Sequence, residues 1–170
     1  AHMDVDFALR ALQQLEEGLS DLYDWFADGL TADGEAEALF RRLANEERRH
    51  TRLVQYQRRL VRSEPKLEYT LAFDAGAVVD ALADVERARS RPEPPDLDGA
   101  LRSACALEAR AAEAHSGLIL RAGEPSLAAL LTRLSGEDLG HADGLRRLAL
   151  ARGLDPGAWG TGAAGAGGEE

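Results

Sequence analysis

The chain has little sulfur, and its scarcity excludes several kinds of site. Cys105 is the one cysteine, so a disulfide framework, a CxxC redox pair, a thiolate zinc site and a rubredoxin-type iron centre are all excluded. The one methionine, Met3, follows Ala1 and His2. We interpret residues 1–3 as left over from an expression vector and leave them out of the argument.

Positive charge and long apolar runs are also scarce. Lys66 is the only lysine, and 20 Lys and Arg against 30 Asp and Glu give a formal net charge of −10. This charge opposes binding to nucleic acid or to an anionic membrane surface. There is no signal peptide and no apolar run of about 18 residues, the length that a membrane-spanning helix needs. We therefore expect a cytoplasmic protein with no nucleic-acid or membrane partner.

What the chain does have is helical periodicity. Apolar residues at alternating steps of three and four predict helices near 4–30, 35–62 and 97–122, and a fourth helix that follows a tight turn at 123–126 and ends near 152. Between the second and third of these, residues 66–96 first alternate like an extended segment (67–73) and then resemble a short helix (74–89). A crossover of about 30 residues lets the second helix reach a parallel neighbour. The prediction is an all-α four-helix bundle over 4–155 with a short extra helix in the crossover, followed by a Gly/Ala-rich disordered tail, 156–170.

Each apolar stripe is interrupted near its middle by acids and histidines at core positions. The interrupting residues are Glu16, Glu47, His50, Glu108, His115, Asp138 and His141. They include every histidine outside residues 1–3. Burying one unpaired carboxylate costs at least several kcal/mol, so these acids predict bound cations.

The spacing of these residues predicts a dinuclear metal site. Glu47 with His50, and Asp138 with His141, are three apart and so share a helix face. Di-iron and di-manganese bundles have a known ligand set: one Glu from each of two helices and a Glu-x-x-His motif from each of the other two. The chain matches this set except that Asp138 replaces Glu, and the set occurs as two copies of one helical hairpin.

Over residues 5–152 the chain resembles the ferritin-like superfamily, nearest its rubrerythrin and bacterioferritin branches. The resemblance is carried by EEGLSDLYDWFA at 16–27 and ANEERRH at 44–50. It implies that Glu16 and His50 are terminal ligands and that Glu47 bridges two ions. It gives Glu108, Asp138 and His141 the corresponding roles in the second half.

Several positions depart from that family. Asp138 is one methylene shorter than the usual Glu, and Glu137 competes with it from about 100 degrees off the stripe. His115 stands where the repeat has Tyr23. It is an added ligand, a proton donor, or a hydrogen-bond partner of Glu16 or Glu47, and we favour the last role.

Two other residues are weaker candidates as metal ligands, and a third indicates that haem is not bound. Cys105 is interpreted as a small buried hydrophobe and Glu113 as a solvated acid, so both rank behind the other candidates as ligands. Arg48 takes the place of the haem-ligating Met of bacterioferritins, so no haem is expected.

The resemblance implies an oxidoreductase with two iron ions, for which manganese or zinc could substitute. It would reduce hydrogen peroxide or O2, with Tyr23 and His115 as the neighbouring proton donors. Because the chain has no rubredoxin domain, electrons would come from an external protein or a small reductant. We expect a homo-oligomer, most simply a dimer. Two alternatives stay open: a ferroxidase that handles iron, and a metal-free helical interaction module.

Overall fold

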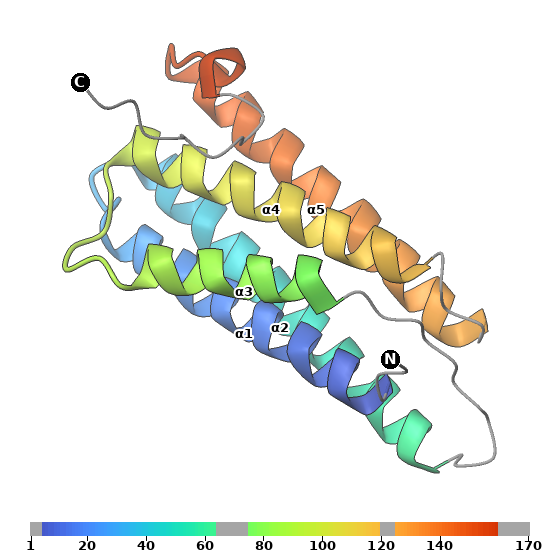
Figure 1. The fold of residues 1–170 in the computed structure, drawn as a ribbon. Coiled ribbons are helices and arrows are strands. Elements are labelled where there is room, and N and C mark those ends of the chain that lie inside the picture. Colours follow the sequence, from blue (N-terminus) through green and yellow to red (C-terminus); the bar gives the residue numbers. More distant parts are fainter. Residues whose placement is uncertain (1–4, 64–74, 120–124, 160–170) are drawn as a thin grey trace, which may run out of the picture.

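The computed structural model describes residues 5–63, 75–119 and 125–159, and within these ranges it is helical with no strand (Figure 1). The prediction of an all-helical fold is confirmed. The elements are α1 (Val5–Asp28), α2 (Gly34–Ser63), α3 (Ala75–Arg89), α4 (Leu97–Ile119), α5 (Pro125–Ala151) and the one-turn 3₁₀ helix η1 (Pro156–Trp159). The extended segment predicted at 67–73 and the helix end predicted at 122 lie outside the described residues.

The four long helices form two hairpins. Helices α1 and α2 pack along each other in opposite directions, and α4 and α5 do the same, whereas α2 and α4 run in the same direction (Figure 1). The predicted short helix of the crossover is α3, and it packs against α1 and α4. Gly18 permits this contact, because a Cβ built there would lie 3.0 Å from Val85 Cγ1.

Side-chain and glycine caps fix the ends of the helices. Asp33 Oδ1 accepts a hydrogen bond from the backbone N–H of Ala36 at 3.1 Å at the start of α2. Gly153, with φ of 72°, ends α5 in the left-handed conformation that glycine adopts without strain. Pro125, which we predict to lie in a turn, is instead the first residue of α5. Proline is favourable there, because the N–H of the first helical residue has no acceptor within the helix.

A buried polar layer divides the apolar core in two. One cluster includes Leu9, Leu12 and Leu131, and the larger one includes Leu19, Phe26, Phe40 and Leu145. Between them lie all the acids and histidines that interrupt the predicted stripes, each 0% exposed except His141 at 7%. The periodicity therefore predicted correctly which polar residues face inward.

The ordered chain continues past the predicted domain end at 155. Residues 156–159, which we assigned to the tail, form η1, and Trp159 packs against the larger apolar cluster. The rest of that tail, 160–170, lies outside the described residues. None of the helices in the described ranges has an apolar stretch long enough to cross a membrane.

We expect Gly18→Leu to destabilise the protein by about 1–3 kcal/mol, because the new side chain must enter the contact between α1 and Val85. The matched control is Gly136→Leu in α5, where an added Cβ meets nothing within 4 Å. Urea unfolding followed by circular dichroism measures both. Equal stability of the two variants would contradict the described packing of α3.

Candidate metal centre

The four long helices each contribute side chains to the polar layer. Glu16 comes from α1, Glu47 and His50 from α2, Glu108 and His115 from α4, and Asp138 and His141 from α5. The helical spacing of the stripes and the packing of the two hairpins bring these residues to one level of the molecule. The two apolar clusters pack against the two faces of this layer.

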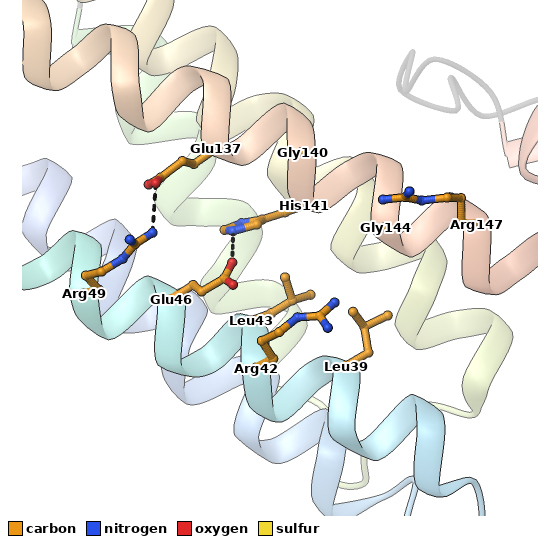
Figure 2. A pocket seen from close by; sticks show the side chains of 10 residues that line it. All are labelled: Leu39, Arg42, Leu43, Glu46, Arg49, Glu137, Gly140, His141, Gly144 and Arg147. Atoms are coloured by element: carbon orange, nitrogen blue, oxygen red, sulfur yellow. Dashed lines mark hydrogen bonds and ion pairs between the residues drawn. The ribbon is translucent and has the colours of Figure 1, made fainter.

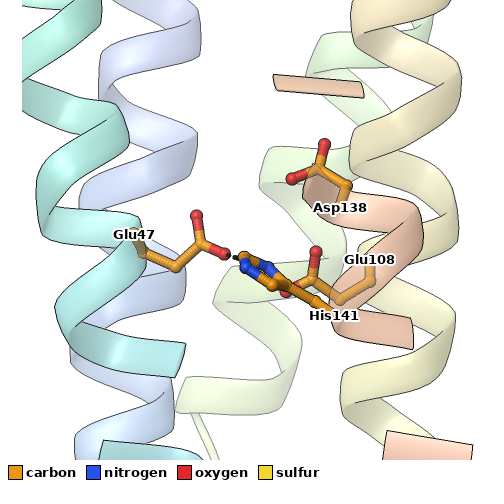
Figure 3. Close-up of side chains that lie close together, drawn as sticks. All are labelled: Glu47, Glu108, Asp138 and His141. Atoms are coloured by element: carbon orange, nitrogen blue, oxygen red, sulfur yellow. Dashed lines mark hydrogen bonds and ion pairs between the residues drawn. The ribbon is translucent and has the colours of Figure 1, made fainter. Parts of the chain in front are cut away.

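Within the described residues, two groups of side chains in the layer could supply ligand atoms to a metal ion. Glu47, Glu108, Asp138 and His141 form one group, and Glu16, Glu47 and His50 form the other; within each group the donor atoms lie within 4.8 Å of one another. Figure 3 shows the first group, with Glu47 and His141 pointing toward each other from α2 and α5. The structure thus brings together all six residues predicted as ligands, and Glu47 belongs to both groups.

Each oxygen of Glu47 faces a different imidazole. His50 Nδ1 lies 3.1 Å from Glu47 Oε2, and His141 Nδ1 lies 3.1 Å from Glu47 Oε1. The two rings are stacked, with centroids 5.6 Å apart and planes at 14°. A carboxylate placed between two ring nitrogens in this way is suited to bridge two cations that each take one imidazole.

The other ring nitrogen of each histidine is held by an outer carboxylate from the opposite hairpin. His50 Nε2 lies 2.6 Å from Glu137 Oε2 of α5. His141 Nε2 lies 2.5 Å from Glu46 Oε2 of α2 (Figure 2). Such contacts fix the tautomer and the ring orientation of metal-binding histidines. Arg49 in turn donates a hydrogen bond to Glu137 Oε1 at 2.8 Å.

The role of these outer acids was only partly visible in the sequence. We considered Glu137 as a competing ligand, but the structure places it behind His50, in neither donor group. Glu46 was missed altogether. A signal was present, since Glu46 directly precedes Glu47 as Glu137 precedes Asp138, so that acid-acid-x-x-His occurs twice.

Tyr23 and His115 connect the two hairpins across the layer. The Tyr23 hydroxyl of α1 donates a hydrogen bond to Glu108 Oε1 of α4 at 2.8 Å. In the reverse direction, His115 Nε2 of α4 lies 3.0 Å from Glu16 Oε1 of α1, and its Nδ1 lies 2.6 Å from Asp138 Oδ2. His115 therefore contacts Glu16, one of its two expected partners, and also Asp138, which we did not expect.

Many carboxylate oxygens of the layer lack a hydrogen-bond donor. The 3.0 Å and 3.1 Å approaches of His115 to Glu16 and of His141 to Glu47 do not have hydrogen-bond angles. The buried oxygens without a donor are Glu16 Oε1 and Oε2, Glu47 Oε1, Glu108 Oε2 and Asp138 Oδ1. Unsatisfied buried carboxylate oxygens are costly, and they are the donors that hard divalent cations take, so the residues fit a metal pair.

Without metal, protons hold this cluster together. Burial, together with the nearby Glu108 and Glu16, raises the pKa of Glu47 well above its usual range. Burial also raises the pKa of Asp138 to about 7. Burial lowers the pKa of His141, but contacts with Glu108 and Glu47 outweigh this and raise it to about 11. Metal binding would displace these protons, so the affinity for metal should rise with pH.

The remaining candidates lie outside both donor groups. Glu113 is exposed on α4. Cys105 is buried, its Sγ lies 3.9 Å from the carbonyl oxygen of Ala142, and burial raises the pKa of its thiol to about 11. A thiol with this pKa stays protonated near neutral pH, which agrees with a packing role.

Glu46→Gln and Glu137→Gln should each weaken divalent metal binding about 10–100-fold, because each removes the charge that orients a histidine. Glu113→Gln is the matched control, since it removes an exposed acid that contacts neither donor group. Competition of each metal-free variant with a chromophoric chelator for Zn²⁺ gives the dissociation constants. If all three variants bound metal like the wild type, the outer acids would have no part in the centre.

The metal-free protein should lose stability as the pH rises from 7 to 9.5. Burial lowers the pKa of His50 and of His115, but contacts with the layer acids raise it by more. The resulting pKa is about 9 for His50 and about 10 for His115, against 6.5 for a free imidazole. Such groups stabilise the fold fully below about pH 6.5, and the contribution is lost as the pH rises through the folded-state pKa. We expect the Tm to fall by more than about 3 °C.

The metal-loaded protein is the control for this pH series, because metal takes the place of the His50 proton and should make Tm depend less on pH over the same range. Differential scanning calorimetry of both forms makes the comparison. A Tm of the metal-free form that rises or stays level from pH 7 to 9.5 would contradict the described contacts.

Comparison with known proteins does not assign the chain to a family or a function. A scan against protein-family models, a search of curated proteins and a search of solved structures each return no significant match. The structure supports a helical protein with a buried carboxylate and histidine cluster that can hold metal.

Proposed function

We propose that the chain is a ferritin-like four-helix protein of the rubrerythrin type that binds two iron ions and reduces hydrogen peroxide or O2. The observation that carries the proposal is the position of Glu47, shared by two donor groups and set between His50 and His141. The parallel course of α2 and α4, joined through the segment that contains α3, also supports it, because ferritin-like folds have this connection.

Charge balance and ligand chemistry favour two divalent ions. The layer holds the carboxylates of Glu16, Glu47, Glu108 and Asp138, and two divalent cations would neutralise these four charges. Oxygen-rich sites with one imidazole each suit iron or manganese, and zinc also binds such donors strongly. Two ferrous ions would supply the two electrons that reduce the O–O bond of a peroxide.

In this proposal, Glu16 and His50 would hold one ion. Glu108, Asp138 and His141 would hold the other, and Glu47 would be shared between them. The apolar clusters pack on both sides of the layer and limit the access of bulk water to it. The outer acids keep the imidazoles of His50 and His141 turned with Nδ1 toward Glu47.

Two further side chains keep protons beside the centre. Burial and the nearby Glu108 raise the pKa of the Tyr23 phenol well above 10, so it remains protonated and donates to Glu108. In the metal-free protein, burial lowers the pKa of His115, but contacts with Asp138 and Glu16 outweigh this and raise it to about 10, so the ring is an imidazolium near neutral pH. We infer that Tyr23 and His115 supply protons as the O–O bond is reduced.

The metal-free interaction module is the weaker alternative, because it leaves the buried oxygens of Glu16 and Asp138 without donors. A ferroxidase would use the same ligands, and the order of reactivity separates it from a peroxidase.

After anaerobic Fe(II) loading, we expect about two irons per chain and near-ultraviolet absorbance that grows faster with one equivalent of hydrogen peroxide than with O2. Glu47→Gln should lose most of the bound iron, while Glu113→Gln should keep it. Stopped-flow absorbance and elemental analysis measure these quantities. A faster reaction with O2 would favour the ferroxidase, and absence of iron in the wild type would overturn both assignments.

A further inference from the structure

A groove between α2 and α5 leads away from the metal centre. Its volume is about 410 Å³ (Figure 2). At one end it is lined by His141 and by the outer acids Glu46 and Glu137. At the other end it is lined by Arg42 of α2 and Arg147 of α5, which also line an adjoining hollow of about 340 Å³.

The two arginines at that end have no counterion among the residues that the structure describes. Arg49, which lines the same groove, is paired with Glu137 at 2.8 Å. Within the described residues, neither Arg42 nor Arg147 has a carboxylate within ion-pair distance, although the chain carries 30 acids. Both arginines are exposed to solvent, and guanidinium groups on two walls of one groove can together pair with an anion.

The other lining residues restrict what kind of anion would fit. Leu39 and Leu43 line the α2 wall next to Arg42, with 8% and 2% of these residues exposed. Gly140 and Gly144 leave space on the α5 wall, since a Cβ added at either would meet no atom within 4 Å. Because Glu46 and Glu137 repel a second negative group at the metal-centre end, the ligand should carry its charge at one end only.

We propose that this groove binds a small organic anion, with a carboxylate or phosphate head between Arg42 and Arg147 and an uncharged body over Leu39 and Leu43. The body then points toward His141, the ligand candidate that is 7% exposed. Binding of this kind needs no bound metal. It can therefore be tested on the metal-free protein, independently of the redox function proposed above.

Isothermal titration of the metal-free full chain with phenyl phosphate, benzoate and neutral benzamide tests the charge requirement. We expect one site per chain for at least one of the two anions and none for benzamide. The anion that binds more tightly identifies the preferred head group, and inorganic phosphate shows how much the uncharged body contributes. Failure of both organic anions to bind would overturn the proposal.

Variants of the arginines locate the site. Arg42→Gln with Arg147→Gln should weaken binding of the preferred anion at least about tenfold. The control Arg52→Gln removes an exposed arginine of α2 that does not line the groove, and it should change binding less than about twofold. Unchanged affinity in the double variant, or equal loss in the control, would place the anion elsewhere.

A steric pair of variants tests the groove itself. Gly144→Leu places a side chain in the groove at a position where the added Cβ meets no atom within 4 Å, whereas Gly136→Leu adds the same side chain to the same helix outside the groove. Both replacements favour the helix, so both variants should fold. We expect Gly144→Leu to abolish anion binding and Gly136→Leu to keep it, and equal affinities would overturn the assignment. Elemental analysis after metal loading shows whether the metal centre is unaffected, which separates this test from that of the proposed function.

Discussion

The structure depends on the neutralisation of four buried carboxylates in one layer. Glu16, Glu47, Glu108 and Asp138 are fully buried between two apolar clusters, and several of their oxygens have no donor. Apart from the histidines of the layer, the other buried polar residues of the described core are uncharged: Ser20, Thr51, Gln57 and Ser135. Cations or protons must balance these charges, and that requirement links stability, pH and metal in this protein.

The layer is built from reciprocal contacts between the hairpins. Glu46 of α2 holds His141 of α5, and Glu137 of α5 holds His50 of α2. Tyr23 of α1 contacts Glu108 of α4, and His115 of α4 contacts Glu16 of α1. Each hairpin thus supplies ligand candidates and also the side chains that orient the ligand candidates of the other hairpin. This reciprocal arrangement follows from the approximate two-fold repeat in the sequence. The repeat is broken at His115, where an imidazole replaces the phenol, so the two halves of the centre are not chemically equivalent.

Periodicity and spacing predicted the helices and the inward polar residues, because a stripe of core positions can be identified within one helix. Asp33 and Gly153 cap their helices through interactions and backbone conformations that involve only neighbouring residues. Contacts that depend on how two helices cross were not predictable. Glu46 lies off the stripe with its side chain 35% exposed, and only the approach of α5 brings it to His141. The same crossing determines the groove and the unpaired state of Arg42.

The most direct test of the central claim is anomalous diffraction at the iron edge from crystals of the chain loaded anaerobically with Fe(II). The account predicts two peaks in the polar layer, one among Glu16, Glu47 and His50 and the other among Glu47, Glu108, Asp138 and His141. Loaded crystals with no anomalous peak in the layer, or with iron bound only at surface acids, would contradict it.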